Sequence, residues 1–257
     1  MDMGLFTKRP RLRSDPRGVF QGPLAHAFAN GAHMPVANGG VWNAIHSACS
    51  CCDARDDREK LRSAWGITDH AGWERALVSL TAADRAPTAL SLVLELRARV
   101  VDSRPGVPFD AGTWPDLVAY WCRERGAPRE TYDEMVAEAA RVWEYEERMV
   151  ADGVLPRGAV VRTVRAYDFG RAVNLARWGV NAGYATEDAA LPHIVRAGAM
   201  SMRHHGSWEE MSAGFTLGRA MGFDDGEFGV YYTDSVKAHR VLATDPESPW
   251  RNLPWRM

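Results

Sequence analysis

The sequence has little cysteine, no long apolar run and no strong excess of charge of either sign. Four cysteines in 257 residues are too few for a disulfide framework, so we expect a reducing, cytoplasmic location. No apolar stretch approaches the ~20 residues that span a bilayer, which excludes a membrane-spanning helix. The basic N-terminal segment is not followed by an apolar stretch, so we expect no signal peptide.

The formal net charge of -2 gives the molecule no overall field that would attract nucleic acid or an anionic membrane. Arginines near the middle of the chain are spread around one predicted helix and form no basic stripe. We therefore expect neither a nucleic-acid partner nor a membrane partner. Hydrophobic residues make up 46% and charged residues 25%, which is typical of a soluble globular protein.

The sequence motifs of the common catalytic classes are missing as well. There is no G-x-S-x-G, no P-loop and no G-x-G-x-x-G, so we predict no catalytic residues and no cofactor. Acidic residues do occur in pairs, including Asp133-Glu134 and the pair Glu144 and Glu147, but they lie on a predicted helix whose face is solvated. We expect no acid–base chemistry from them.

Two groups of potential metal ligands need to be considered. The first group is His46, Cys49, Cys51 and Cys52. One tetrahedral zinc site normally takes ligand pairs from two separate segments, and the adjacent pair Cys51 and Cys52 would point in different directions.

The second group comprises His193, His204 and His205. On a helix His193 and His204 are eleven residues apart, which is about 16 Å by helical rise, and His204 and His205 diverge by about 100°. We therefore predict no metal site.

Capping residues, Gly and Pro stops and helical spacing of apolar residues predict a mainly α protein, a single multi-helix globular domain with an irregular N-terminal extension. We expect residues 1–20 to be a mobile basic tail and residues 21–56 to be an irregular extension with short helices. These short helices are predicted at 24–29 and 41–48. The helical domain is predicted over 57–257, with one short extended segment at 156–164.

The stretch RAYDFGRAVNLARWGVNAGY, residues 165–184, predicts a helix that is apolar on two sides, as expected at the centre of a fold. Asp168 and Arg171 are three residues apart and can pair directly. A helical projection places Tyr167 and Trp178 on the same side as this pair, which would shield it partly from water. The pair is interpreted as a structural strut, with a ligand or partner docking point and a catalytic pair as alternatives.

Four segments of the chain together resemble one bacterial family, called domain of unknown function 1266, over roughly residues 60–255. They are WGITDHAGWERALVSL at 65–80, YDFGRAVNLARWGVNAGYATEDAA at 167–190, SWEEMSAGFTLGR at 207–219 and SPWRNLPW at 248–255. The most specific matches are Asp168, Arg171, Arg177, Gly179, Gly183 and Tyr184. A Trp usually precedes the Asp in that family, and Tyr167 keeps a large ring there. The resemblance implies a helical architecture and a bacterial, intracellular origin, and it brings no established activity.

Two kinds of function fit these observations. Ten tryptophans and a Trp-Pro C-terminal tail favour a non-enzymatic protein-binding module, such as an adaptor or an antidote, with a protein partner. The alternative is an enzyme or ligand-binding protein that acts on an anionic small molecule or nucleic acid through Asp168 and nearby arginines. The candidate binding residues for either role are Asp168, Arg171, Arg177, Tyr167, Trp178 and Tyr184.

Overall fold

A computed structural model describes residues 10–46, 54–82, 88–224 and 226–257. Within these ranges the regular structure is helical and contains no strand, which confirms the predicted mainly α fold class. The α-helices are α1 (Gly22–Asn30), α2 (His33–Asn38), α3 (Ala54–Trp65), α4 (His70–Leu80), α5 (Ala89–Ser103), α6 (Trp114–Arg125), α7 (Arg129–Ala151), α8 (Arg165–Asn181), α9 (Glu187–His204), α10 (Trp208–Phe223), α11 (Val230–Thr244) and α12 (Pro249–Asn252).

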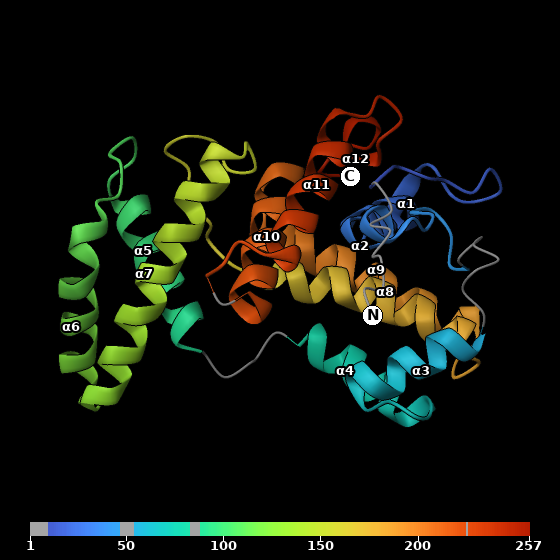
Figure 1. Cartoon of the computed structure of the whole chain (residues 1–257), viewed down its shortest axis with the longest axis horizontal. Helices are drawn as coiled ribbons and strands as arrows, with labels where there is room; N and C mark the ends of the chain where they lie inside the picture. The colour runs from blue at the N-terminus through green and yellow to red at the C-terminus, as the bar shows by residue number, and fades with distance from the viewer. Residues whose placement is uncertain (1–9, 47–53, 83–87, 225) are drawn as a thin grey trace, which may run out of the picture.

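Helix α8 is the central helix of the fold. It packs against α9, α10, α4, α3, α1 and α2, and Figure 1 shows it running through the middle of the larger part of the molecule. Ten of its residues are buried, among them Phe169, Val173 and Leu175. The sequence-based expectation of a central helix that is apolar on two sides therefore agrees with its packing.

A second group of helices, α5, α6 and α7, forms a lobe at one end of the molecule (Figure 1). Its apolar core also takes in one side of α10 and α11. Helix α10 belongs to both cores, because Met211 and Phe215 face the core around α8 whereas Ala213 and Leu217 face the lobe. Helix α11 contributes to both cores as well, so the lobe is joined to the rest of the fold through α10 and α11.

Two glycines on α10 allow the close approach that their spacing predicts. A Cβ atom at Gly214 would lie 2.6 Å from the carbonyl oxygen of Thr163, and one at Gly218 would lie 2.8 Å from that of Val164. Any larger residue would push the start of α8 away from α10.

The segment that precedes α8, residues 156–164, was expected to be extended, but it forms no strand. Side chains bind its backbone instead, as described below for Val161.

The N-terminal extension agrees with the sequence prediction only in part. Helix α1 confirms the helix predicted at 24–29, but the helix predicted at 41–48 is wrong for residues 41–46, which form bends. Their backbone bonds go elsewhere, because the Trp42 amide donates to the Arg13 carbonyl and the Asn43 carbonyl accepts from the Val19 amide. The mobility of residues 1–20 stays a prediction, and residues 1–9 lie outside the described part.

The predicted helix starts differ in accuracy. Ser207 accepts a hydrogen bond from the Glu210 amide and caps α10, as its spacing predicts. Thr131 and Glu134 have the spacing of a capping box, which would start a helix there, but α7 begins earlier, at Arg129 after Pro128. None of the helices described is both long enough and apolar enough to cross a membrane.

Candidate functional site

Asp168 and Arg171 form an ion pair at the N-terminal end of α8. The side chain of Asp168 is 14% exposed and that of Arg171 is 21% exposed. The guanidinium of Arg171 lies 4.5 Å from the ring centroid of Tyr167 and 5.3 Å from that of Trp65. The expected shielding by Tyr167 is thus present, and Trp65 supplies a second ring that was not predicted.

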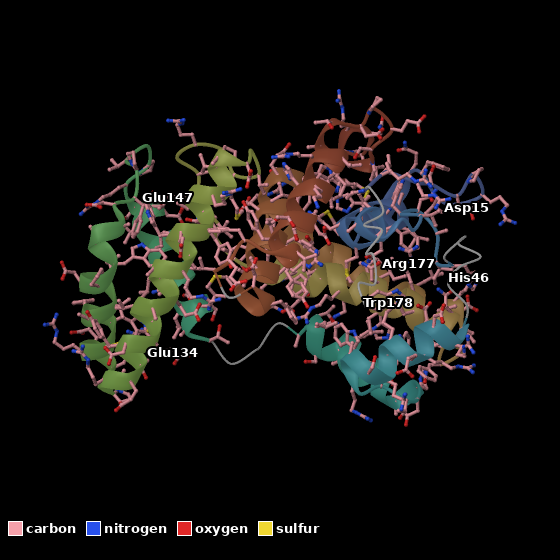
Figure 2. All side chains as sticks on the ribbon, viewed as in Figure 1. Asp15, His46, Glu134, Glu147, Arg177 and Trp178 are labelled. Carbon is pink, nitrogen blue, oxygen red and sulfur yellow. The ribbon has the colours of Figure 1, made fainter. Side chains whose placement is uncertain are left out.

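Trp178 lies elsewhere, close to the other end of α8. Its ring lies below the ammonium group of Lys60, with 4.7 Å between Nζ and the ring centroid. Trp178 and Arg177 line a hollow of about 200 Å³ between α2, α3 and α8, and neither Asp168 nor Arg171 lines it. The candidate binding residues therefore separate into a paired group at one end of α8 and a hollow at the other. Figure 2 labels Arg177 and Trp178 on α8, close to α3. The acidic residues Glu134 and Glu147 are exposed on α7, in the lobe.

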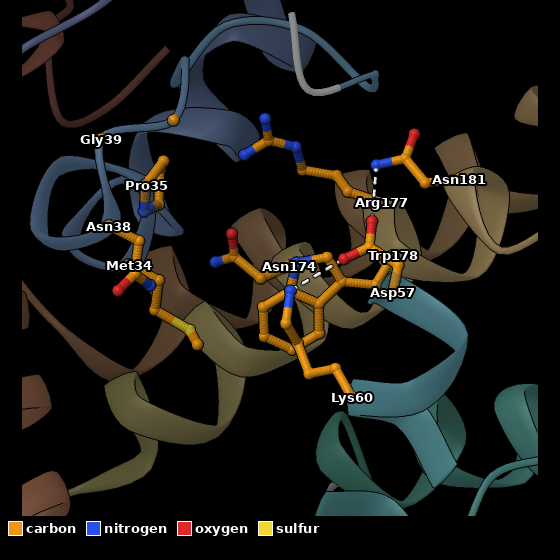
Figure 3. Close-up of a pocket in the computed structure, with 11 residues that line it drawn as sticks. Met34, Pro35, Asn38, Gly39, Asp57, Lys60, Asn174, Arg177, Trp178 and Asn181 are labelled. Carbon is orange, nitrogen blue, oxygen red and sulfur yellow. Dashed lines mark hydrogen bonds and ion pairs between the residues drawn. The ribbon is translucent and has the colours of Figure 1, made fainter. Parts of the chain in front are cut away.

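The polar side chains of this hollow, called the Arg177 pocket below, come from regular helical spacings. On α8, Asn174, Arg177, Trp178 and Asn181 are spaced i, i+3, i+4 and i+7, so they share one face of the helix. On α3, Asp57 and Lys60 are spaced i and i+3 and contact α8 through Asn181 and Trp178. The opposite wall is the C-terminal end of α2 with Gly39 and Gly40 (Figure 3).

Arg177 is the most unusual of these residues because its charged side chain is only 5% exposed and forms no ion pair among the described residues. Its Nη2 donates a hydrogen bond to the carbonyl oxygen of Val41 across 2.7 Å. Burial lowers the pKa of Arg177 to about 10, and the Asp57 carboxylate offsets part of this effect. The guanidinium therefore stays charged at neutral pH.

Asp57 is the acidic residue of the pocket, and it is fully buried. Its Oδ1 accepts a hydrogen bond from Lys60 Nζ at 2.8 Å, and its Oδ2 accepts one from Asn181 Nδ2 at 3.1 Å. These bonds are drawn in Figure 3. Asp57 is thus hydrogen-bonded to Lys60 and Asn181, whereas Arg177 has no ion-pair partner of its own among the described residues.

Asn174 supports the floor of the pocket. Its amide nitrogen donates to the carbonyl oxygens of Gly31 and Gly170, at 2.9 and 2.8 Å, which fixes the orientation of the side chain. This amide also links α8 to the turn between α1 and α2. The position of the α2 wall relative to Arg177 is therefore held by a buried hydrogen bond as well as by the Arg177 bond to Val41.

The remaining residues singled out in the sequence lie outside the pocket. The carbonyl oxygen of Tyr184 is hydrogen-bonded to His70 Nδ1, and Tyr184 packs partly buried against the core around α8. Two of the arginines available for an anion, Arg196 and Arg203, are exposed on α9. A binding role for Asp168, Arg171, Tyr167 and Tyr184 stays a prediction.

Of the two groups of potential metal ligands, the histidines His193, His204 and His205 lie within the described residues, but the His46 group does so only in part. His46 bonds to Glu187 and Asn181, while Cys49, Cys51 and Cys52 lie outside the described residues. Among the described residues, no group of three or more His, Cys, Asp or Glu is arranged to hold a metal ion.

Sequence reasoning singled out Arg177 and Trp178, which line the pocket, but it did not single out Asp57, Lys60 or Trp65. The spacing of Asp57 and Lys60 on one face of a helix was a local signal, and it indicates only an ordinary surface pair. Their meeting with Arg177 depends on packing between segments 120 residues apart in the chain.

The fold and the pocket together define the structural class of the protein: it is mainly helical, with a buried arginine beside an open hollow. The sequence matches the family described as "Protein of unknown function (DUF1266)" over residues 60–255. This match covers more than half of the chain, so the protein belongs to that family, as its motifs predicted. Comparison with curated proteins and with solved structures gives no match. The α2 wall of the pocket lies outside the matched region, whereas Arg177 lies inside it.

Proposed function

We propose that this protein binds a small anionic molecule in the Arg177 pocket. The observation that carries the proposal is the buried guanidinium of Arg177, which has one carbonyl partner and no ion pair within the described part of the chain. A buried charge is costly unless a counter-charge compensates it. An anion in the adjoining hollow would supply that counter-charge and accept the remaining N–H groups.

The position of the pocket supports a binding role for Arg177 over a purely structural one. A structural arginine typically donates most of its N–H groups to protein acceptors, as Arg97 does. Arg177 donates one hydrogen bond to the protein, to the carbonyl oxygen of Val41, and it borders a hollow large enough for a small molecule. The pocket shows no nucleophile or pair of free carboxylates, so binding is proposed without a reaction.

Thermal unfolding with a set of small anions would test this proposal. We expect at least one anion to raise the unfolding temperature of the wild-type protein, since a ligand that binds only the folded state stabilises it. The effect should be lost in Arg177→Met and kept in Arg203→Met, which removes an exposed arginine outside the pocket. Lys60→Met, at a side chain that is 41% exposed, is a second variant that should fold and bind more weakly.

The proposal fails if every anion that stabilises the wild type stabilises Arg177→Met equally. If Arg177→Met does not fold, an unchanged response in Lys60→Met leads to the same conclusion. Arg177 would then be a residue that holds Val41 in place, and its unfavourable burial would be part of the fold alone.

A protein-binding role is a second candidate, supported by one exposed apolar patch. Phe223, Val230 and Tyr231 are 49%, 58% and 42% exposed at the junction of α10 and α11, and the Phe223 and Tyr231 ring centroids are 5.5 Å apart. Exposed contiguous apolar surface is typical of interaction sites. Affinity purification with wild-type and Tyr231→Ser bait would test this role, with a stoichiometric partner expected only for the wild type.

The tryptophans give this second candidate no support. In the tail, Trp250 and Trp255 are buried against Trp208, and the Trp255 indole donates to the carbonyl of His205. The other tryptophans of the chain are buried or half-buried as well. The rings that suggested a protein partner are packed inside the protein, so binding of a protein partner stays a prediction. A cytoplasmic location stays a prediction as well.

A further inference from the structure

The charged residues that line the Arg177 pocket limit the charge of a ligand. There are three of them, the cations Lys60 and Arg177 and the anion Asp57, so their charges sum to +1. A single negative charge on the ligand would neutralise this sum. A phosphate monoester carries about −1.5 to −2 at neutral pH and would leave excess negative charge in a half-closed space.

The helix ends around the pocket work against a second negative charge as well. Asn181 is the last residue of α8, and the C-terminal end of a helix carries partial negative charge. The N-terminal end of α3 carries partial positive charge, but Asp56 and Asp57 already lie in its first turn. Neither helix therefore supplies the N-terminal cradle of amides that is typical of phosphate sites.

The guanidinium of Arg177 suits a planar acid group. Its Nη2 donates to Val41, whereas no acceptor for Nε or Nη1 is found in the part of the chain that the structure describes. Guanidinium and carboxylate groups are both planar and commonly join through two parallel hydrogen bonds. Phosphate and sulfonate can be held through two parallel hydrogen bonds as well. The net charge of the pocket disfavours a phosphate dianion, and a sulfonate is a weaker base and a poorer hydrogen-bond acceptor than a carboxylate.

The remaining walls limit the size and polarity of the rest of the ligand. Met34, Pro35 and the Trp178 ring are apolar, and the hollow measures about 200 Å³. An engineered cavity of about 150 Å³ in another protein binds benzene, so a single ring with an acid group is of suitable size. The amide of Asn38 and the amide oxygen of Asn174, whose nitrogen is bonded to Gly31 and Gly170, are the groups placed to pair with a polar substituent on such a ring.

We propose that the ligand of the Arg177 pocket is a small monocarboxylate with an apolar body the size of one ring. This inference rests on the proposed anion-binding function and specifies its ligand class. The carboxylate pairs with Arg177, and the ring lies between Trp178 and the Met34–Pro35 wall. Lys60 remains on Asp57 at the rim of the pocket.

Isothermal titration with four ring probes separates charge from shape. Benzoate is planar with charge −1, benzenesulfonate is tetrahedral with charge −1, phenyl phosphate is tetrahedral with a charge near −2 at neutral pH, and benzamide is a neutral match for benzoate. We expect benzoate to bind best, at least about tenfold more tightly than phenyl phosphate and than benzamide, which corresponds to about 1.4 kcal/mol. Benzenesulfonate should lie between benzoate and phenyl phosphate.

Variants connect this order to the pocket. Arg177→Met should weaken benzoate binding at least about tenfold, the loss expected for one charged hydrogen-bonded partner. Arg203→Met, outside the pocket, should leave it unchanged. A short peptide with a free C-terminal carboxylate tests whether the acid group could come from a protein chain, and we expect it to bind more weakly than benzoate.

Each other result overturns a defined part of the account. Tighter, Arg177-dependent binding of phenyl phosphate or benzenesulfonate refutes the monocarboxylate but keeps the anion-binding function. Tighter binding of the peptide refutes the free small molecule. If no ring probe binds in an Arg177-dependent way while other small anions do, the ring-sized carboxylate is wrong. If no anion does, the proposed function is wrong as well.

Discussion

The indole of Trp73, on α4, lies directly against Gly179 of α8. Its Nε1 donates a hydrogen bond to the carbonyl oxygen of Leu175 across 3.0 Å, one turn before Gly179. Trp73 is only 1% exposed, and its ring occupies the space where a side chain on Gly179 would lie. The absence of a side chain at position 179 is therefore what allows α4 to dock on α8.

Gly179→Ala should destabilise the protein by at least about 2 kcal/mol, because a methyl group would overlap the buried indole and force α4 outward. Gly222→Ala is the matched control. It is also a glycine in a helix, but a Cβ atom there meets nothing within 4 Å. The control should gain roughly 0.5–1 kcal/mol from helix propensity. Equal midpoints of urea unfolding for the two variants would contradict the docking role of Gly179.

Asp168→Ala should cost roughly 2–4 kcal/mol, because it leaves the shielded guanidinium of Arg171 without its ion-pair partner. The double variant Asp168→Leu with Arg171→Met should recover much of this loss, since it removes both charges and keeps an apolar chain beside Tyr167 and Trp65. Denaturant titration of the three proteins tests the strut. An unchanged midpoint for Asp168→Ala would show that the pair does not support the fold.

Glu146→Gln should be among the more damaging single substitutions in the lobe, at about 3–5 kcal/mol. Glu146 forms two hydrogen bonds with Arg97, at 2.5 and 2.6 Å, and also accepts the Val161 amide at 2.7 Å. The Arg97 side chain is 1% exposed, so its charge cannot turn to water after the substitution.

The exposed pair Arg129 and Asp133 provides the control for this variant. Asp133→Asn should leave the unfolding midpoint unchanged, because exposed ion pairs contribute little. Similar losses in the two variants would mean that burial does not determine the strength of the Arg97–Glu146 pair.

The protein should lose stability between pH 7 and pH 5, in part through His205. Burial lowers the pKa of His205 from 6.5 to about 4 in the folded state. The unfolded chain then binds more protons below pH 6.5, so this contribution is complete above that pH and is lost as the pH falls toward 4. For one such group the loss from pH 7 to pH 5 is about 2 kcal/mol. Burial also lowers the pKa of His26, His33 and His239, which adds to the slope in the same direction.

His205→Gln removes this titration while keeping a polar group that can bond the Ser201 carbonyl, the partner of His205 Nδ1. Urea unfolding at a series of pH values should therefore give a flatter slope for the variant than for the wild type. The same slope in both proteins would show that His205 is not protonated on unfolding in this range.

Much of the fold follows from local sequence signals. Ser207 and Asp69 cap α10 and α4 where their spacing predicts, and Gly126 ends α6 in the left-handed conformation. Helix α11 was not predicted, because its N-cap, Gly229, has no side chain, and Asp224, five residues away, holds its amide instead. Local signals predict helix ends well where the cap is adjacent and poorly where it is not.

The site was less predictable than the fold, since it depends on contacts between distant segments. The helical projection placed both Tyr167 and Trp178 beside the Asp168–Arg171 pair. Tyr167 lies there, but Trp178 lies by Lys60, and Trp65 reaches the pair from α3. Arg177 was one of several arginines in the sequence. Its burial, its single bond to Val41 and its position opposite Asp57 follow from how α2 and α3 pack on α8.

A crystal structure of the protein grown with the carboxylate that binds it most tightly would test the central claim most directly. The account predicts the acid group in the hollow between α2, α3 and α8, hydrogen-bonded to the guanidinium of Arg177, with its apolar body against Trp178. An acid group bound elsewhere, with Arg177 still bonded only to the carbonyl oxygen of Val41 and the hollow filled by solvent, would contradict it.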